Sequence, residues 1–519
     1  MVLNKIRILA IIAILSLSAY AADVTSLLSG NWSDPTIWSN GVVPTAVDNV
    51  TINDTHIITL DAVDAAVNNL TVGNGTSGSF LSSKTMAGKI TINGDLVIMS
   101  GATFKTQTST VGVLIHTFTV YGNITNNGGI IALRNGSTSA SPQTLAVMNL
   151  SLLGTNTVTI TMGAPSATNT GFNGATINKT GGAKIILGSD MICGSGSSAA
   201  PTAEPIVNLT NGIIETGAYV FISLSTTSAT VSAGSSVSYI NGTMGRGMSN
   251  TAGKLGTFAI GDKNGYRPAS VKSSTSGVVT GHYLKVGCFS GNANTGSSTF
   301  PDGLIDKVSG VRYYKVSFGR TVAAAVTAPD TMGIDTFRPS YAIGDGVAAG
   351  NLNLRCAYSS DDRATWTELH DNYPDLTVAS DTVKNYMSDT LASAIFIKDG
   401  GKSIYFAIAR LTGTTENTLD GTTAIARENG KTNTFVLDQN YPNPFNPSTA
   451  ISYEINKAGM TNLKVYDVMG REVMMLVNEQ QEAGRYNVKF NASSLASGIY
   501  LYKLTSGNLS VTKKMSLLK

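Results

Sequence analysis

The sequence predicts an all-β protein, and three observations lead to this fold class. Charged residues make up only 13% of the 519-residue chain, too few for the solvent-facing sides of many helices. Glycine occurs 54 times, and serine, threonine and asparagine are frequent, a mixture that suits short strands joined by tight turns. Hydrophobic residues still reach 42%, which is enough to form cores and argues against general disorder.

Residues 1–21 predict a signal peptide. Lys5 and Arg7 precede a short apolar stretch, and Ala19-Tyr20-Ala21 gives the small-x-small pattern of a cleavage site. The apolar stretch is too short to cross a bilayer, and no later segment approaches the roughly 20 apolar residues that a membrane-spanning helix needs. We therefore expect a mature chain that starts near Ala22, has no transmembrane segment and is exported via the periplasm.

Residues 22–254 predict a right-handed parallel β-helix-like solenoid. Short alternating strands end in glycine or asparagine turns, as at residues 70–73, 90–94, 118–122 and 150–154. Equivalent strands recur about every 20 to 30 residues, which fits stacked coils. Conventional antiparallel hairpins in a sandwich are the alternative. Asn-x-Ser/Thr triplets occur at Asn49, Asn69, Asn123 and Asn208, and the high content of Asn, Ser and Thr in the chain accounts for them.

The start of this region, residues 30–44 with Trp32 and Trp38, resembles the start of many secreted bacterial β-helix proteins. In those proteins the Trp-containing segment caps the first coil. A stack of coils needs such a cap because its end otherwise leaves apolar side chains and an unpaired strand edge exposed.

Residues 255–412 predict an antiparallel β-sandwich, because longer alternating segments with more aromatic residues occur at 282–286, 311–318, 352–356 and 403–409. Residues 413–435 have no apolar period and predict a flexible linker. Residues 436–519 alternate in short segments between turns and predict a compact Ig-like β-sandwich.

The last of these regions carries the most specific motif. It contains a proline-rich segment (residues 440–447), a Tyr-Asp…Gly-Arg turn, a Gly-Ile-Tyr strand start and a basic end. The residues are Asn440, Tyr441, Pro442, Asn443, Pro444, Phe445, Asn446, Pro447, Tyr466, Asp467, Gly470, Arg471, Gly498, Tyr500, Lys513 and Lys514.

Together these motifs resemble the type A C-terminal sorting domain of the type IX secretion system, an export route of the Bacteroidetes–Chlorobi group of bacteria. The resemblance implies recognition by the secretion machinery at the outer membrane. It also implies a protein that is secreted or attached to the outer-membrane surface, with surface polysaccharide as a further partner. From the residues themselves, the prolines predict a stiff segment that pairs with no strand, and Lys513 and Lys514 predict a charged edge that a secretion component reads.

The charge distribution argues against nucleic acid as a partner. The net charge is +3, of which residues 436–519 carry +3 and the signal peptide +2, so residues 22–435 carry −2. A nearly neutral body lacks the basic surface that binds phosphates.

We predict no catalytic, cofactor-binding or metal-binding residues. His56, His116, His282 and His370 are isolated, and no nucleophile elbow, zinc motif or P-loop occurs. Asp48, Asp54, Asp61 and Asp64 are the carboxylates that a solenoid enzyme would use, and loop capping is their ordinary role.

The segment 359–366 and the three cysteines are predicted to have structural roles. Residues 359–366 resemble the Asp-box hairpin of sialidase-like propellers, with Arg363 in place of glycine, and predict a hairpin stabilised by Asp361 and Trp366. Cys193, Cys288 and Cys356 fit either three buried thiols or one bridge between Cys288 and Cys356.

The sequence thus predicts a non-enzymatic, adhesin-like or structural surface protein. A polysaccharide-active enzyme, such as a lyase or hydrolase, or a carbohydrate-binding protein on the solenoid is the alternative.

Overall fold

Strands make up almost all the regular structure of this chain. The computed structural model describes residues 21–518 except 63, 136–142, 164–170, 195–206, 225–230, 248–254, 274–281, 321–330, 343–344, 348–352, 370–383, 387–389, 399–400, 416, 421–434, 456–458, 482–483, 494 and 508. Within these residues the single helical element is the 3-10 turn η1 (Pro35–Ile37), which confirms the all-β class. The chain forms two compact units, Met1–Ala424 (unit 1) and Ile425–Lys519 (unit 2). Ala19 and most of the expected signal peptide lie outside the described residues.

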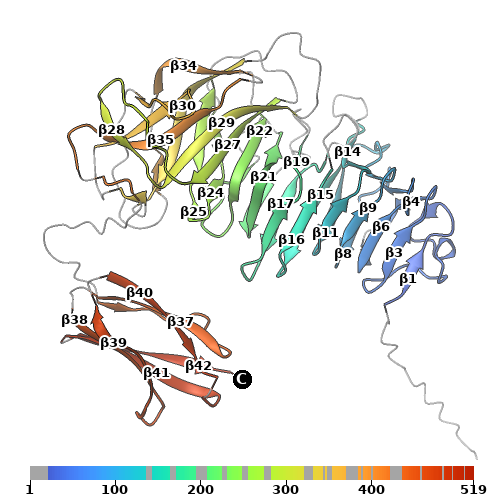
Figure 1. Ribbon diagram of the computed structural model, residues 1–519. Coiled ribbons are helices and arrows are strands. Elements are labelled where there is room, and N and C mark those ends of the chain that lie inside the picture. The colour runs from blue at the N-terminus through green and yellow to red at the C-terminus, as the bar shows by residue number, and fades with distance from the viewer. Residues whose placement is uncertain are drawn as a thin grey trace, which may run out of the picture. The chain divides into compact units, whose positions relative to one another are not determined.

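Unit 1 begins with three stacks of parallel strands (Figure 1). The first stack contains β1 (Asp23–Thr25), β3 (Asn49–Ile52), β6 (Asn69–Val72), β9 (Leu96–Ile98), β12 (Ile124–Asn126), β16 (Val158–Thr161), β18 (Lys184–Leu187), β19 (Met191–Cys193), β21 (Ile213–Ser223), β22 (Ile240–Gly247) and β24 (Ile260–Asp262). The second stack contains β2 (Gly30–Asn31), β4 (Ile57–Leu60), β7 (Ser79–Ser82), β10 (Thr103–Lys105) and β13 (Ile130–Ala132). The third stack contains β5 (Ala65–Val67), β8 (Lys89–Ile92), β11 (Leu114–Val120), β15 (Ala146–Gly154), β17 (Ala175–Lys179) and β20 (Val207–Asn211), with β14 (Arg134–Asn135) antiparallel to β15.

The chain visits the stacks in a fixed order. From β4 to β16 it passes from the second stack to the third and then to the first, interrupted by the short β14 alone. Strand side chains alternate between the two faces of a sheet, so every second residue points inward. Val50, Leu70 and Leu96 are in register and fully buried, and the rings of Phe80 and Phe104 stack with centroids 5.0 Å apart. The period-two pattern of the sequence therefore builds one continuous core.

The first coil is closed by the tryptophan segment. Trp32 and Trp38 are buried, with ring centroids 5.0 Å apart, and Nε1 of Trp38 donates to the carbonyl of Trp32 at 3.1 Å. The neighbouring Ser39 exchanges hydrogen bonds with Thr25 on the outer edge of β1. The backbone groups of Thr25 on this edge are therefore satisfied within the chain, which closes part of the edge of β1.

A ladder of asparagine and aspartate side chains runs along the first stack. Asn49 donates to Asp23, and Asn69 donates to Asn49. The backbone N–H of Asp95 donates to the amide oxygen of Asn69, and Asn123 donates to Asp95. The Asn-x-Thr triplets at residues 49, 69 and 123 therefore recur because this strand position bonds to the next coil. Composition, the reason given from the sequence, is an incomplete explanation.

Pairing changes from parallel to antiparallel at β22, next to the predicted boundary at residues 254 and 255. β22 is parallel to β21 and β24 and antiparallel to β27. The antiparallel strands that join this sheet are β25 (Gly265–Tyr266), β27 (His282–Ser290), β28 (Ile305–Val308), β29 (Arg312–Arg320), β31 (Leu354–Ser359), β32 (Thr367–Glu368) and β35 (Ile404–Leu411). A second antiparallel sheet contains β23 (Leu255–Phe258), β26 (Ala269–Ser273), β30 (Thr331–Tyr341), β33 (Lys384–Tyr386) and β34 (Thr390–Lys398). One hydrophobic cluster extends from Val24 to Leu419, through both the parallel and the antiparallel parts.

A buried ionic network lies in the antiparallel part. Arg312 donates to Asp262 through Nε and Nη2, at 2.8 and 3.1 Å, and through Nη1 to Asp345. Arg267 donates to Asp345 through Nε at 2.9 Å. All four side chains are at most 9% exposed. Two arginines and two aspartates balance in charge, which is what permits their burial.

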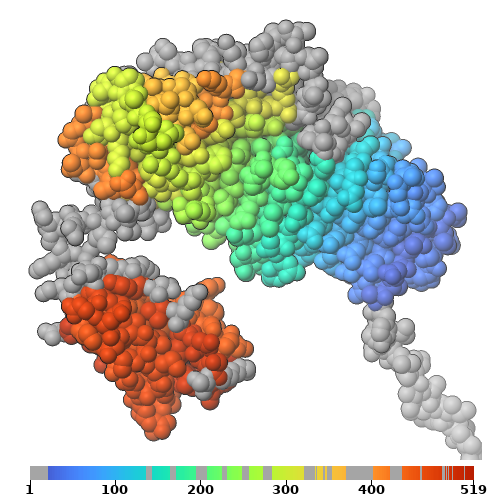
Figure 2. Space-filling view, viewed as in Figure 1, coloured from blue at the N-terminus to red at the C-terminus, as the bar shows by residue number. Residues whose placement is uncertain are grey.

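Unit 2 consists of two antiparallel sheets around its own core. One sheet contains β36 (Val436–Leu437), β37 (Ser448–Ile455) and β40 (Gly484–Asn491), and the other contains β38 (Gly459–Tyr466), β39 (Glu472–Gln481), β41 (Gly498–Ser506) and β42 (Leu509–Leu517). The core includes Ile451, Tyr453, Leu463 and Tyr502. Figure 2 shows this unit from orange to red.

Candidate functional site

The proline-rich segment is anchored at its first residue. Asn440 is 1% exposed, and its amide donates to the carbonyl of Pro442 and to Oγ1 of Thr449, both at 3.0 Å. Its backbone N–H donates to the hydroxyl of Tyr502 at 2.9 Å, and that hydroxyl donates to the carbonyl of Asp438. The next residue, Tyr441, is 83% exposed. The segment therefore combines a fixed start with an outward-facing aromatic side chain.

The prediction that this segment pairs with no strand is wrong. The N–H of Phe445 donates to the carbonyl of Ser516, and the N–H of Leu518 donates back to Phe445. The side-chain oxygen of Asn443 accepts from the N–H of Ser516 at 2.9 Å. Pro442, Pro444 and Pro447 lack an N–H, but Phe445 between them keeps its own and donates it to the neighbouring strand. Pro442, Asn443, Pro444 and Asn446 are exposed, Pro447 is half-buried, and Phe445 is buried in the core.

The turn between β38 and β39 is held by Asp467. One carboxylate oxygen accepts from the N–H groups of Met469 and Arg471, and the other accepts from Nε of Arg471 at 2.7 Å. These bonds lower the pKa of Asp467. Gly470 has a φ of 79°, which glycine adopts without strain. The turn leaves Met469 exposed, and the preceding Tyr466 is half-buried.

The basic end of the chain lies on an edge strand. β42 pairs with β41 on one side; on the other side the proline-rich segment pairs near Ser516, and the side-chain amide of Gln439 donates to the carbonyl of Lys514 at 2.7 Å. Lys513 is half-buried and Lys514 is exposed, and neither forms an ion pair with another described residue. At the start of β41, Gly498 is exposed and Tyr500 is buried, with its hydroxyl donating to Ala496 at 2.8 Å. The edge is thus charged but partly closed.

The four candidate acidic residues have separate partners. Asp48 accepts from Ala22 and Thr45, and Asp61 accepts from Ser33. Asp54 accepts from the N–H groups of residues 74, 76 and 77, which lower its pKa to about 2. Asp64 pairs with Lys89 at 3.0 Å. Within the described residues, no group of three His, Cys, Asp or Glu side chains is arranged to hold a metal ion.

The histidines and cysteines are likewise dispersed. His56 lies 2.7 Å from Oγ of Ser26, and His116 accepts from the N–H of Gly88 through Nδ1. His282 is in β27, and His370 lies outside the described residues. Cys193, Cys288 and Cys356 are all buried and none is in a disulfide, so the alternative bridge between Cys288 and Cys356 is absent from this structure.

The Asp-box-like hairpin has the expected internal bonds. Oδ1 of Asp361 accepts from Oγ of Ser359 and from the N–H of Thr365, and Oδ2 accepts from Oγ1 of Thr365 at 2.6 Å. Trp366 is fully buried beneath it. Arg363, at the glycine position of the box, has a φ of 71°.

Among the described residues, no helix is long and apolar enough to cross a membrane. Ala21, at the expected cleavage site, is exposed.

The comparisons with known proteins agree with the motifs of unit 2. Residues 439–517 match the family model of the secretion system C-terminal sorting domain. The comparisons with curated proteins and with solved structures found no match. The match covers the anchored proline-rich segment, the Asp467 turn and the basic edge strand. This chain therefore carries a type IX secretion C-terminal sorting domain, which engages the type IX machinery and directs the protein to secretion or to the outer-membrane surface.

Proposed function

We propose that this protein is a non-catalytic, adhesin-like or structural component of the bacterial surface or the extracellular medium. In this proposal residues 1–21 are a signal peptide that leads the chain through the periplasm. Residues 22–254 are a right-handed parallel β-helix, residues 255–412 an antiparallel sandwich and residues 436–519 an Ig-like sorting domain. The fixed order of the three parallel stacks supports the β-helix, because consecutive coils of such a fold repeat one path.

The outward columns of the first stack are the observation that carries the proposal. Thr25, Thr51, Thr71, Thr125 and Thr161 occupy one column, interrupted by Val97, and all are half-buried. The asparagine ladder forms the column beside it. Such a surface carries hydroxyl and amide groups at the regular strand spacing and little charge, which suits contacts with sugars or proteins.

The alternative is a polysaccharide-active enzyme or a carbohydrate-binding protein whose site lies on the solenoid. Asp48, Asp54, Asp61 and Asp64 each have partners of their own, which favours the non-catalytic proposal over a lyase or hydrolase built from them. The purified chain should release no reducing ends from pectin, alginate or glucan. Release that is abolished by an Asp-to-Asn change at one of these four positions would establish the enzyme instead.

Export is tested by deleting residues 436–519. We expect the truncated chain to be absent from the medium and the cell surface. A second variant, Lys513→Gln with Lys514→Gln, should reduce export without changing stability by more than about 0.5 kcal/mol, because neither lysine has an ion pair to lose. Lys503→Gln, an exposed lysine of the adjacent strand, is the matched control. Export of the double variant at the control level would exclude the basic edge as the recognised feature.

A further inference from the structure

Arg363 has an unfavourable backbone conformation. It and the preceding Asp362 have φ values of 71° and 61°, in the left-handed region that an L-residue adopts at a cost. Glycine, the ordinary residue of the box at this position, would remove the cost at Arg363. A residue that keeps such a conformation often does so for what its side chain reaches.

The guanidinium group of Arg363 lies over aromatic rings. Its central carbon is 4.5 Å from the ring centroid of Tyr313 and 5.4 Å from that of Tyr405. Nη1 donates to the carbonyl of Asn292 at 3.2 Å. Nε is buried and has no hydrogen-bond partner in the described structure. The group is therefore held in position while part of its donor capacity is unused.

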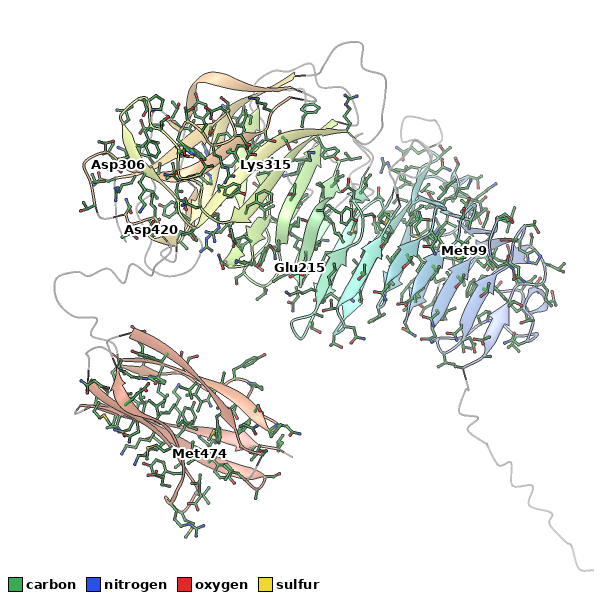
Figure 3. All side chains as sticks on the ribbon, in the orientation of Figure 1. Met99, Glu215, Asp306, Lys315, Asp420 and Met474 are labelled. Carbon is green, nitrogen blue, oxygen red and sulfur yellow. The ribbon has the colours of Figure 1, made fainter. Side chains whose placement is uncertain are left out.

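A second cation lies at the same rings. Nζ of Lys315 is 5.7 Å from the ring centroid of Tyr405, its cross-strand neighbour, and Figure 3 labels Lys315 on this part of the sheet. Burial and a hydrogen bond to Asp362 raise the pKa of Tyr405 to about 12, so the phenol stays neutral. Two cations therefore lie at the neutral ring of Tyr405, beside the exposed Asp362.

The absence of ion pairs at Arg363 and Lys315 contrasts with four arginines in the antiparallel part of the chain. Arg267, Arg312, Arg355 and Arg410 each pair with an Asp or Glu at 2.8 or 2.9 Å. Neither Arg363 nor Lys315 has an ion pair in the part of the chain that the structure describes. Among the described residues, two cations at one ring, neither of them in an ion pair, outnumber the single neighbouring carboxylate and form a site that is complementary to an anion.

An aromatic surface adjoins the two cations. Phe289 and Tyr313 are half-buried cross-strand neighbours whose rings stack with centroids 5.6 Å apart. Phe289 lies against Gly287, where an added Cβ would come within 2.5 Å of its ring. Aromatic rings bind the apolar face of a sugar ring, and an arginine binds a carboxylate through two parallel donors.

We propose that Phe289, Tyr313, Lys315 and Arg363 bind a carboxylate-bearing sugar of an anionic polysaccharide. The carboxylate lies between Arg363 and Lys315, and the face of the sugar ring packs on Phe289. This inference rests on the proposed function and specifies its ligand as a uronic acid polymer.

The test uses the full chain and isothermal titration calorimetry with polygalacturonate. Arg363→Gly restores the glycine of the box, so the variant should fold with undiminished thermal stability while its affinity falls roughly tenfold or more. Lys315→Gln should also weaken binding. Arg410→Gln, which removes a cation that is paired with Asp306, should bind as the unchanged chain does. Binding should weaken as salt is added.

Methyl-esterified polygalacturonate separates the carboxylate from the rest of the sugar. We expect it to bind much more weakly than the free acid. Equal binding of the two polymers, or unchanged binding by a stably folded Arg363→Gly variant, would overturn the proposal and leave Arg363 a structural residue. If the chain binds neutral glycans but not polygalacturonate, this inference fails and glycan adhesion stands. If it binds no glycan in a broad panel and no extracellular matrix protein, the adhesin-like function fails.

Discussion

Burial sets the behaviour of single polar residues in this protein, and His116 is the clearest case. Its side chain is fully buried, Nδ1 accepts from Gly88, and burial lowers its pKa from 6.5 to about 4. The folded state therefore holds the neutral imidazole at pH values where the unfolded chain is already protonated.

Replacing His116 by Gln should flatten the pH dependence of stability. In the unchanged chain the stabilising contribution is complete above pH 6.5 and is lost as the pH falls toward 4, because the unfolded state binds the proton first. Between pH 7.5 and 4.5 the unchanged chain should lose about 2 kcal/mol more than the variant. Urea unfolding at both pH values measures this difference. Identical pH profiles would mean that folding does not lower the pKa of His116.

In the buried ionic network, unlike at His116, the folded state requires the charged form of the side chain. Arg312→Met leaves Asp262 and Asp345 without their main partner and should lower the free energy of unfolding by about 3–5 kcal/mol. Arg410→Met, at the more exposed pair with Asp306, should cost no more than about 1 kcal/mol. Denaturant midpoints of the two variants check the comparison, and equal losses would refute it.

At the scale of elements, the proline-rich segment stabilises unit 2 through the side-chain amide of Asn440. Asn440→Ala removes the donors to Pro442 and Thr449 in a buried place and should cost about 1–3 kcal/mol. Tyr441→Ala, next to it and 83% exposed, should cost less than about 0.5 kcal/mol. Thermal unfolding of both variants gives the measurement. A loss in Tyr441→Ala as large as that in Asn440→Ala would show that the anchor lies elsewhere.

The sequence predicted elements better than it predicted their partners. Alternation placed the strands near residues 70–73 and 90–94, because period two reports the face of a strand that is buried. It could not show that Asn49 bonds to Asp23, or that Phe445 pairs beside Ser516, because these bonds join residues far apart in the chain. Arg312 and Asp262 are 50 residues apart and carry no local signal. Arg363 was visible as a departure from the box, but the rings beneath it were not.

At the scale of the whole molecule, the two largest hydrophobic cores of the described residues share no residue. One extends from Val24 to Leu419 and the other from Leu437 to Leu517. The first does not stop where parallel pairing gives way to antiparallel pairing, although the sequence predicts separate domains there. The boundary at residues 254 and 255 stays a prediction.

Calorimetry should therefore resolve two unfolding transitions, one for each unit. Asn440→Ala should lower the midpoint of one transition, and Arg312→Met should lower the midpoint of the other. A single transition that both variants shift equally would mean that the units unfold together.

Because the chain visits the three stacks in a fixed order, each coil adds one strand to every stack and lengthens the stacks by the same amount. Gly94 and Gly122 lie two residues after the ends of β8 and β11, and Asp95 and Asn123 immediately precede β9 and β12, which pair in register. Removing residues 95–122 would join Gly94 to Asn123 and keep every inward column aligned, shortening the stack by one strand spacing of about 4.8 Å. Gene duplication or loss of such segments would then adjust how far the protein reaches in small, equal steps, without a new fold having to evolve.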